Sequence, residues 1–250
     1  MLSFIVPAHN EESLIGRTIE SLHGAARGVE REYEIVVADD SSTDRTGRIA
    51  AQRGARVVRI DRRQIAAARN AGARAATRTG CDDALVFVDA DTVVPAATLR
   101  AALAALSRGA VGGGAAVCFD GEVPRWANVA LNITLLAFRA LRWAAGCFVF
   151  CTREAFDAAG GWDESVFASE EILFSRALGT LGRFVVLREH VVTSGRKVRC
   201  YSAREIVATM LRIGLAGRGG VSDRSRLDIW YARRRVDPHA PGAQVAGADR

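Results

Sequence analysis

The sequence predicts an α/β fold in which a mostly parallel sheet is flanked by helices, and two observations predict it. Over the first 110 residues, apolar segments of strand length alternate with segments whose apolar residues recur at helical spacing. Three of the strand-like segments end in polar or acidic residues, and in the clearest case the apolar run 84–88 stops at Asp89 and Asp91. The alternation indicates βαβ units with right-handed crossovers and therefore parallel neighbouring strands.

The elements of the first half follow in chain order. The first strand is expected to break at Pro7, and the helix after it has apolar residues at helical spacing from Leu14 to Leu22. Pro95 favours the first turn of a further helix. The expected strands are 3–7, 33–38, 57–60 and 84–89, and the expected helices between them are 11–26, 43–53 and 64–79.

The second half is less regular. The expected elements are a strand at 111–119, a helix at 123–145, a strand at 146–151, a helix at 169–181 and a strand at 184–187. Ser202 and Glu205 have the spacing of a capping box, which predicts another helix start. We therefore expect one domain over 1–200, with a nucleotide-binding half (1–110) and an acceptor half (111–200). A basic helical extension (201–236) and a disordered tail (237–250) follow.

Charge is distributed unevenly along the 250 residues. Residues 1–195 contain 22 basic and 23 acidic side chains, whereas 196–250 contain 12 basic and 5 acidic ones. This asymmetry favours a phosphate-rich partner or an anionic membrane face for the C-terminal part. The alternative is an ordinary solvated face, because 33 of the 34 basic residues are arginine in a chain rich in alanine and glycine, as codon bias would produce.

Cysteine usage and hydropathy exclude several classes of protein. The five cysteines form no Cys-x-x-Cys pair, which argues against a zinc ribbon or a disulfide scaffold and favours a reducing compartment. No secretory signal is visible at the start, so a cytoplasmic location is expected. The uncharged stretch from Trp126 to Phe138 is too short for a membrane span of about 20 residues and indicates a buried or interfacial helix.

The acids that follow the strands carry the chemistry. Asp89 and Asp91 are expected at the C-terminal edge of the sheet, where open α/β sheets bind ligands. Two carboxylates there suit a divalent cation that can hold a diphosphate. The alternative is a strand followed by an Asp-rich turn. Residues 39–44, Asp-Asp-Ser-Ser-Thr-Asp, end a second strand in the same way.

The ordered set of motifs resembles the family 2 glycosyltransferases of the GT-A fold, which has a Rossmann-like sheet. The set consists of Pro7-Ala8-His9-Asn10-Glu11, Asp39-Asp40, Ala68-Arg69-Asn70, Asp89-Ala90-Asp91 and the acids Glu170 and Glu171. The resemblance covers roughly residues 3 to 200. It implies transfer of a sugar from a nucleotide-diphosphate donor, with inversion of the anomeric centre.

The resemblance also implies roles on the donor side. Pro7, Ala8 and Glu11 wall the base and ribose. Asp39 reads the pyrimidine of a UDP-sugar, because a carboxylate can accept the imide proton, and Asp89 with Ala90 grips ribose and sugar. Arg69 neutralises the diphosphate. The alternatives are helix capping for the acids 39–44, which we favour for Asp44, and an ordinary exposed helical arginine at position 69.

Metal and base complete the expected site. Asp91 is the expected ligand of Mg²⁺ or Mn²⁺, and His190 a further ligand or else an ordinary surface or core histidine. Glu171 occupies the position where the family usually has an aspartate base, and Glu170 could share that role. Both acids would alternatively stabilise the N-terminus of a helix. The basic residues 194–199 either close over the diphosphate or form a solvated loop.

The partners expected from the sequence are a nucleotide sugar and an acceptor that could be lipid-linked. Peripheral contact with the inner face of a membrane is expected through the apolar helix 123–145 and the basic C-terminal segment, in particular residues 224–235. No nucleic acid is expected because no recognition motif accompanies the basic residues. No processive-synthase motif follows Glu171, so a single transfer is expected. The competing classes are a nucleotidyltransferase, disfavoured by the acidic residues after the first strand, and a non-catalytic nucleotide-sugar-binding module.

Overall fold

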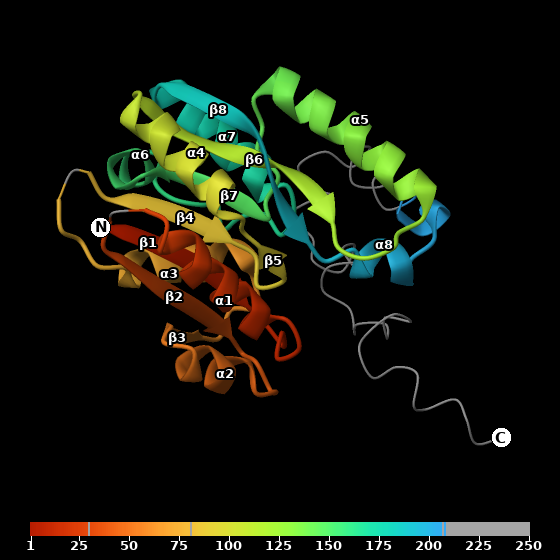
Figure 1. The fold of residues 1–250 in the computed structure, drawn as a ribbon, viewed down its shortest axis with the longest axis horizontal. Coiled ribbons are helices and arrows are strands. Elements are labelled where there is room, and N and C mark those ends of the chain that lie inside the picture. The colour runs from red at the N-terminus through yellow and green to blue at the C-terminus, as the bar shows by residue number, and fades with distance from the viewer. Residues whose placement is uncertain (30, 81, 207, 209–250) are drawn as a thin grey trace.

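The computed structural model describes residues 1–29, 31–80, 82–206 and 208. They contain one sheet of eight strands in the order β3-β2-β1-β4-β7-β6-β8-β5 (Figure 1). Strands β3, β2, β1 and β4 are parallel neighbours, β7 runs antiparallel to both β4 and β6, and β8 runs parallel to β6. The strands are β1 Leu2–Ala8, β2 Tyr33–Asp40, β3 Arg56–Ile60, β4 Ala84–Val88, β5 Thr92–Val93, β6 Ala110–Phe119, β7 Phe148–Thr152 and β8 Arg183–Thr193.

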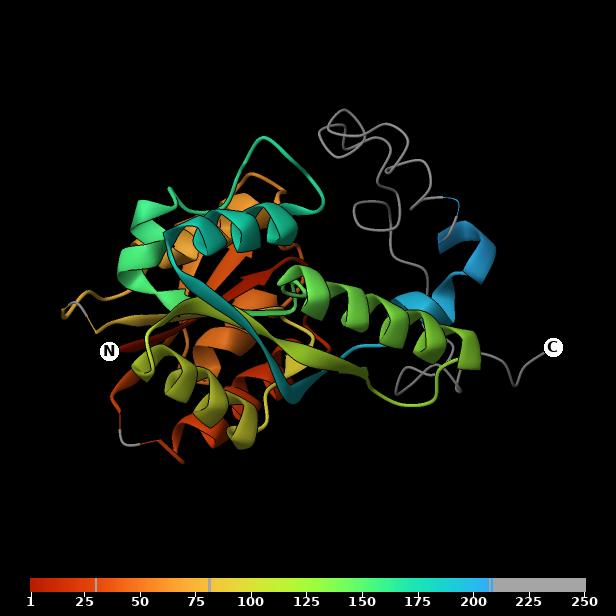
Figure 2. The ribbon, with the colours of Figure 1, turned by 90° about the horizontal axis from the view of Figure 1, so that it is seen from above.

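Helices cover both faces of this sheet, which confirms the predicted α/β layering (Figure 2). The inner residues of α1 and α4 form one core with the face of the sheet that carries Phe4 and Val86. The inner residues of α3, α6 and α7 form the other core with Ile5 and Phe87. The helices are α1 Ile15–Ala26, α2 Thr46–Gln52, α3 Ile65–Ala75, α4 Ala96–Ser107, α5 Arg125–Leu141, α6 Arg153–Ala158, α7 Glu170–Leu181 and α8 Arg196–Cys200.

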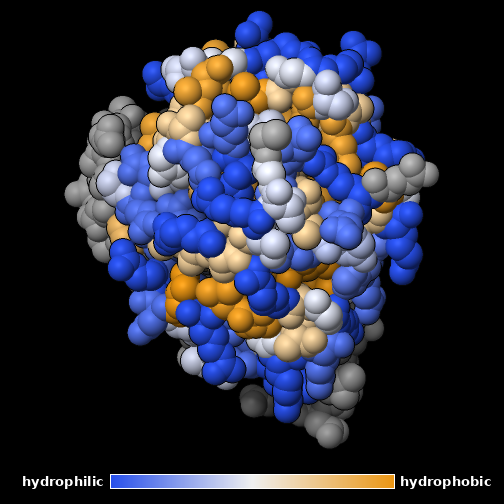
Figure 3. Space-filling view, turned by 90° about the vertical axis from the view of Figure 1, so that its left-hand side faces the viewer, coloured by the Kyte–Doolittle hydropathy of each residue, from blue (hydrophilic) through white to orange (hydrophobic). Residues whose placement is uncertain are grey.

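The two ends of the sheet differ in character. The N-terminus lies at the end where β1 and β4 begin, and Figure 3 looks onto that end and shows mostly hydrophilic residues with apolar patches between them. The acids that follow β2 and β4 lie at the opposite end, beside α8 (Figure 1). The acidic side chains predicted to bind ligands therefore lie at the carboxyl ends of the central strands.

Two boundaries in the first half correct the prediction. The first strand does not break at Pro7 but continues through it to Ala8, because β1 pairs with β4 only as far as Ile5 and Pro7 has β2 as its remaining neighbour. The first helix begins at Ile15 rather than at residue 11, because the loop before it is tied to α2 by the bond from Glu11 N to Thr46 Oγ1 (2.7 Å).

The second half departs further from the prediction. Strand β8 extends to Thr193 instead of ending at Leu187, because it pairs with β6 along its length and with β5 at its end. The short strand β5 and the helices α6 and α8 were not predicted. Helix α5 is shorter than the expected 123–145, and it ends where Arg142 adopts a left-handed conformation with φ 56°.

The capping box is formed. Ser202 N and Oγ both donate to Glu205 Oε2, at 2.8 and 2.9 Å, and Glu205 N donates to Ser202 Oγ at 3.3 Å. The rest of the expected basic extension, residues 209–236, and the expected disordered tail, 237–250, lie outside the described residues. Within the described ranges, no helix combines the length and the apolar character needed to cross a bilayer.

Candidate active site

The carboxyl ends of β1, β2 and β4 bring most of the expected donor-side residues together. Pro7 and Ala8 close β1 and are buried, and Ala8 pairs with Asp39 at the end of β2. Asp89 and Asp91 lie in the turn between β4 and β5. That turn is fixed by Thr18 of α1, whose hydroxyl donates to the buried Ala90 carbonyl at 2.8 Å.

The acids at the end of β2 and after it differ in how many backbone amides they bind. Asp40 Oδ1 accepts the amides of Arg62 and Arg63, and its Oδ2 accepts that of Gln64, all at 2.8 Å, so Asp40 holds the start of α3. Asp44 Oδ1 accepts the amide of Thr46, the first residue of α2, at 2.9 Å, although the N-cap position itself is Arg45. Asp39 is buried at the strand end and accepts one longer bond, from Ser42 N at 3.3 Å. Asp39 is therefore the acid of this group with the fewest structural commitments.

Arg69 has a different place from the one expected. Its side chain is 1% exposed, with Nη2 3.0 Å from Asp89 Oδ1 and Nη1 2.9 Å from Glu170 Oε1. Nη2 also donates to the Gly146 carbonyl at 2.8 Å, and the guanidinium carbon lies 4.3 Å from the centre of the Trp162 ring. Burial disfavours the cation, but Asp89 and Glu170 outweigh it and raise the pKa of Arg69. Arg69 thus joins two acids, and the exposed-arginine alternative is wrong, while its contact with a diphosphate stays a prediction.

The acceptor-side acids differ in their surroundings. Helix α7 begins at Glu170, which is buried against Arg69, so its carboxylate is already paired. Glu171 has no such short ion pair among the described residues, and a side chain added at Gly146 would meet it at 3.6 Å. Burial, followed by repulsion from Glu170, raises the pKa of Glu171 to about 8. The ionised form of Glu171 is consequently a stronger base than an ordinary carboxylate, and it predominates only above about pH 8.

A second charged cluster surrounds Asp91. Arg196, at the start of α8, donates to both carboxylate oxygens of Glu11 at 3.3 Å and lies 3.8 Å from Asp91 Oδ2. Thr193 at the end of β8 donates to Asp91 Oδ1 at 3.3 Å. Burial, with the carboxylates of Glu11 and Asp89, raises the pKa of Asp91 to about 6. The cluster thus holds more negative charge than its neighbours compensate.

His190 is not brought to this cluster. It was expected just after a strand, but it lies inside β8, three residues before Thr193, and its side chain is exposed. Its carbonyl accepts from Thr98 of α4 at 2.7 Å. The expectation of a metal-binding histidine here fails because β8 is longer than its apolar core suggested.

The comparisons with known proteins agree with this geometry. The profile of Glycosyl transferase family 2 matches residues 3–157, which is more than half of the chain. The chain belongs to glycosyltransferase family 2. Among curated proteins, no sequence match to the glycosyltransferase is found.

Solved structures of glycosyltransferases share the GT-A fold with this enzyme. TarS from Staphylococcus aureus (residues 1–349) has a TM-score of 0.61 and 19% identity, over 92% of this chain and 69% of that chain. A mannosyltransferase from Pyrobaculum calidifontis, in complex with GDP-mannose and Mn²⁺, has a TM-score of 0.65 and 20% identity, over 87% of this chain and 62% of that chain. Glucosyl-3-phosphoglycerate synthase from Mycobacterium tuberculosis, in complex with Mn²⁺, UDP and glucosyl-3-phosphoglycerate, has a TM-score of 0.58 and 23% identity, over 90% of this chain and 81% of that chain.

Sequence reasoning gave no role of their own to several residues of the candidate site. Trp162 packs on Arg69 and stacks on Phe174 at 4.3 Å. Asn70 is buried and exchanges hydrogen bonds with the Trp162 backbone, accepting from its N and donating to its O at 2.9 Å each. Arg196 was grouped with a basic loop, although it occupies a short helix. The Gly160-Gly161 pair before Trp162, both with φ near +78°, was the available signal for this packed turn.

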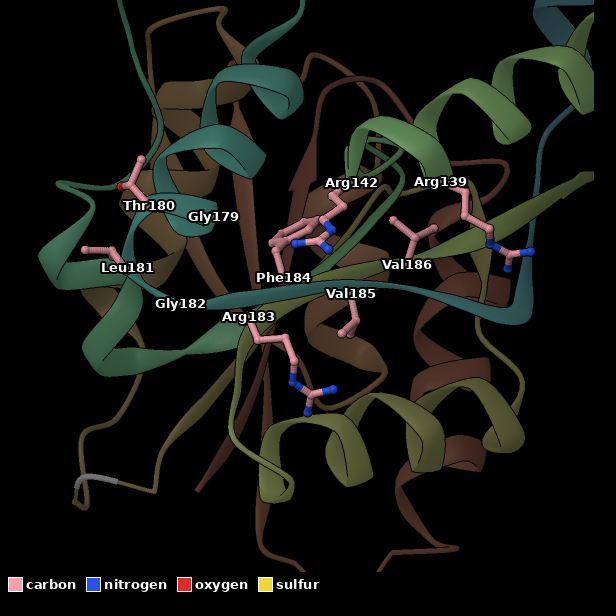
Figure 4. Close-up of a pocket in the computed structure, with 10 residues that line it drawn as sticks. All are labelled: Arg139, Arg142, Gly179, Thr180, Leu181, Gly182, Arg183, Phe184, Val185 and Val186. Carbon is pink, nitrogen blue, oxygen red and sulfur yellow. The ribbon is translucent and has the colours of Figure 1, made fainter.

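A separate hollow of about 740 Å³ lies along the free edge of β8 in the glycosyltransferase (Figure 4). Its lining includes Arg139 and Arg142 from the end of α5, Arg183 on β8, and no acidic residue. A site that binds a divalent cation needs oxygen ligands such as carboxylates. We therefore place the candidate active site at the acid-bearing strand ends and not in this hollow.

Proposed function

We propose that this glycosyltransferase moves a sugar from a nucleotide-diphosphate donor to an acceptor hydroxyl in a single, metal-dependent displacement. The observation that carries the proposal is the buried bridge from Asp89 through Arg69 to Glu170, the neighbour of Glu171. It links the donor side of the site to the acceptor side within one rigid cluster. Family membership disfavours the nucleotidyltransferase alternative.

The donor side is proposed to take a UDP-sugar. Pro7, Ala8 and Glu11 form the wall for base and ribose, Asp39 accepts the uracil imide proton, and Asp89 with Ala90 grips ribose and sugar. The burial of Asp39 and its single long hydrogen bond support that role. Solved relatives bind UDP, UDP-GlcNAc or GDP-mannose, which supports a nucleotide sugar as the donor class.

The surroundings of Asp91 fit Mg²⁺ or Mn²⁺. Burial and the neighbouring acids raise the pKa of Asp91 even though Lys197 and Arg196, the latter 3.8 Å away, partly compensate its charge. Within the described ranges, no three histidine, cysteine or acidic side chains converge as a closed metal cage. This suits a cation bound by one or two carboxylates together with donor phosphates and water. When bound, the cation would stabilise the charge that develops on the departing diphosphate.

Glu171 is proposed as the general base. Its carboxylate accepts the proton of the acceptor hydroxyl while that oxygen bonds to the anomeric carbon, and the bond from that carbon to the diphosphate breaks on the opposite face. Attack from the face opposite the departing diphosphate inverts the anomeric centre. The raised pKa supports that role because the ionised form of Glu171 is a stronger base than an ordinary carboxylate, and activity is then expected to rise with pH toward about 8. Glu170 is proposed to hold Arg69 rather than to share the proton transfer.

We propose that the enzyme transfers one sugar each time it binds an acceptor. The basic C-terminal segment favours a lipid-linked acceptor. The part of that segment beyond residue 208 lies outside the described residues. Residues 194–199 are proposed to act through Arg196, whose guanidinium can turn from Glu11 and Asp91 to the phosphates.

A thermal-shift panel of nucleotide sugars with and without Mn²⁺ tests the proposal. A ligand that binds only the folded state raises the melting temperature. We expect one UDP-sugar to raise it only when Mn²⁺ is present, and Asp91→Asn to abolish that shift. Asp82→Asn, at an exposed acid away from the site, is the matched control and retains it. The proposal is contradicted if Asp91→Asn keeps the shift as Asp82→Asn does, or if no nucleotide sugar raises the melting temperature of the wild-type protein.

A further inference from the structure

Helix α5 exposes an apolar stripe that the proposed transfer reaction does not use. Val129, Ile133 and Leu136 are 58%, 63% and 69% exposed. They are spaced by four and three residues and therefore lie on one side of the helix. Leu131 and Leu135 lie on the opposite side and pack against the core. The helix thus has one apolar face turned to the protein and a second turned to solvent, and it projects beyond the body of the fold (Figure 2).

The charged residues on helix α5 itself have a single sign, while Glu122 just before the helix and Glu189 on β8 are exposed acids. No acidic residue occurs anywhere in 123–152, whereas Arg125 and Arg139 are exposed on the helix and Arg142 ends it. At 3.6 residues per turn, Arg125 and Arg139 flank the same side of the stripe, one near each end. The hollow beside the end of α5 is lined by Arg139 and Arg142, whereas the Arg183 side chain points away from α5 and donates to the Arg108 carbonyl at the end of α4 (Figure 4).

We propose that α5 docks in the interface of an anionic lipid bilayer, with the stripe buried among acyl chains and the arginines at the lipid phosphates. An amphipathic helix with an apolar face flanked by arginines binds such an interface through buried apolar area and attraction to anionic headgroups. With 17 residues, α5 is about 25 Å long. It therefore lies in the plane of the membrane surface and does not span it. This inference goes beyond the proposed transfer and does not depend on it.

Two other occupants fit the surface less well. A second copy of the chain, meeting this face by two-fold symmetry, would bring the arginines of both copies together. A single helix face of this length also falls well short of the roughly 800 Å² per partner that a stable dimer buries. Residues 209–250 of the same chain contain eight arginines and four aspartates, so their net charge has the same sign as the surface.

Vesicle co-sedimentation of the full chain tests the proposal. The wild-type chain is expected to bind vesicles of phosphatidylcholine and phosphatidylglycerol in a salt-sensitive way, and to bind pure phosphatidylcholine far less. Ile133→Gln/Leu136→Gln is expected to lower the partition coefficient at least tenfold, because two exposed apolar side chains lose their burial in lipid. Asn128→Gln/Thr134→Gln, on the same helix but off the stripe, is expected to bind like wild type.

A charge-matched pair separates specific contacts from general attraction. Arg125→Gln/Arg139→Gln is expected to weaken binding to the anionic vesicles roughly 30-fold, since each of the two basic groups near such a surface contributes about 1 kcal/mol. Arg48→Gln/Arg59→Gln removes the same charge from exposed positions on α2 and β3 and is expected to change binding less than twofold.

Three outcomes would overturn the proposal. They are no binding of the wild-type chain to anionic vesicles, unchanged binding of Ile133→Gln/Leu136→Gln, or a dimer in sedimentation velocity that this variant converts to monomer without any vesicle binding. Unchanged melting temperatures of the variants establish that they are folded, which is expected because the replaced side chains are exposed.

Discussion

The buried guanidinium of Arg69 forms an ion pair with the half-buried carboxylate of Asp89, with Nη2 3.0 Å from Oδ1. Asp89 follows a central strand, whereas Arg69 belongs to a helix packed on one face of the sheet. The second arm of the same guanidinium holds Glu170. Donor-side and acceptor-side acids therefore share one cation, and the predictions below follow from that arrangement.

Removal of this cation should destabilise the fold. Arg69→Ala leaves Asp89 and the buried Glu170 without a counter-charge, so the free energy of unfolding should fall by about 3–5 kcal/mol. Arg69→Lys should restore only part of it, because an ammonium cannot serve both acids and the Gly146 carbonyl with the same geometry. Chemical denaturation measures both. Arg74→Ala, on the same helix with an exposed side chain, is the control, and equal stability of the Arg69 and Arg74 variants would refute the assignment.

The glycine pair before Trp162 offers a matched test of packing. Gly160 and Gly161 have φ of +77° and +78°, so alanine is strained to the same degree at both, by about 1–2 kcal/mol. At Gly160 the added carbon meets nothing within 4 Å, whereas at Gly161 it lies 2.7 Å from Asn70 Oδ1. Thermal unfolding should therefore show Gly161→Ala less stable than Gly160→Ala by roughly 1–3 kcal/mol. Equal melting temperatures would mean that the Asn70 contact is not fixed.

Stability should depend on pH through Glu171. Because its pKa is raised to about 8 in the folded state, the folded protein retains a proton that the unfolded chain releases above about 4.5. The unfolded state then binds fewer protons, and stability falls as pH rises from about 4.5 to 8. Glu171→Gln removes this loss, so its melting temperature should exceed that of wild type by a margin that grows over this range. Glu154→Gln, at an exposed acid, should show no growing margin.

Arg196 should compete with the proposed metal. Its guanidinium pairs with both oxygens of Glu11 and lies 3.8 Å from Asp91, so it supplies positive charge where a cation would bind. In Arg196→Gln, Mn²⁺ without donor should raise the melting temperature more than in wild type, while donor affinity in the presence of Mn²⁺ should fall at least tenfold. Arg188→Gln, exposed on β8, is the control. A smaller Mn²⁺ effect in the Arg196 variant would contradict this competition.

Features that depend on neighbouring residues in the sequence were predictable. Asp44 binds the first amide of α2, and the capping box at Ser202 and Glu205 is formed, because each uses side chains within three residues of the groups that they satisfy. The alternation of strands and helices also held, since burial of one helix face and of whole strands leaves a period in the sequence.

Features that depend on distant residues were not predictable. Arg69 is buried by partners 77 and 101 positions away, and nothing in its own helix distinguishes it from an exposed arginine. His190 was misplaced because β8 continues through polar residues, which an edge strand tolerates when one neighbour supplies its hydrogen bonds. Glu171 was proposed as the base from the resemblance alone, whereas only the structure distinguishes it from Glu170, which is paired with Arg69.

Turnover of donor by Glu171→Gln tests the central claim most directly. Glutamine keeps the size of the side chain but cannot accept the acceptor proton, so kcat should fall by at least roughly 100-fold. The Mn²⁺-dependent binding of the nucleotide sugar, measured by calorimetry on the same variant, should stay within about threefold of wild type. Wild-type kcat in the Glu171→Gln variant would contradict the proposal that this carboxylate is the base.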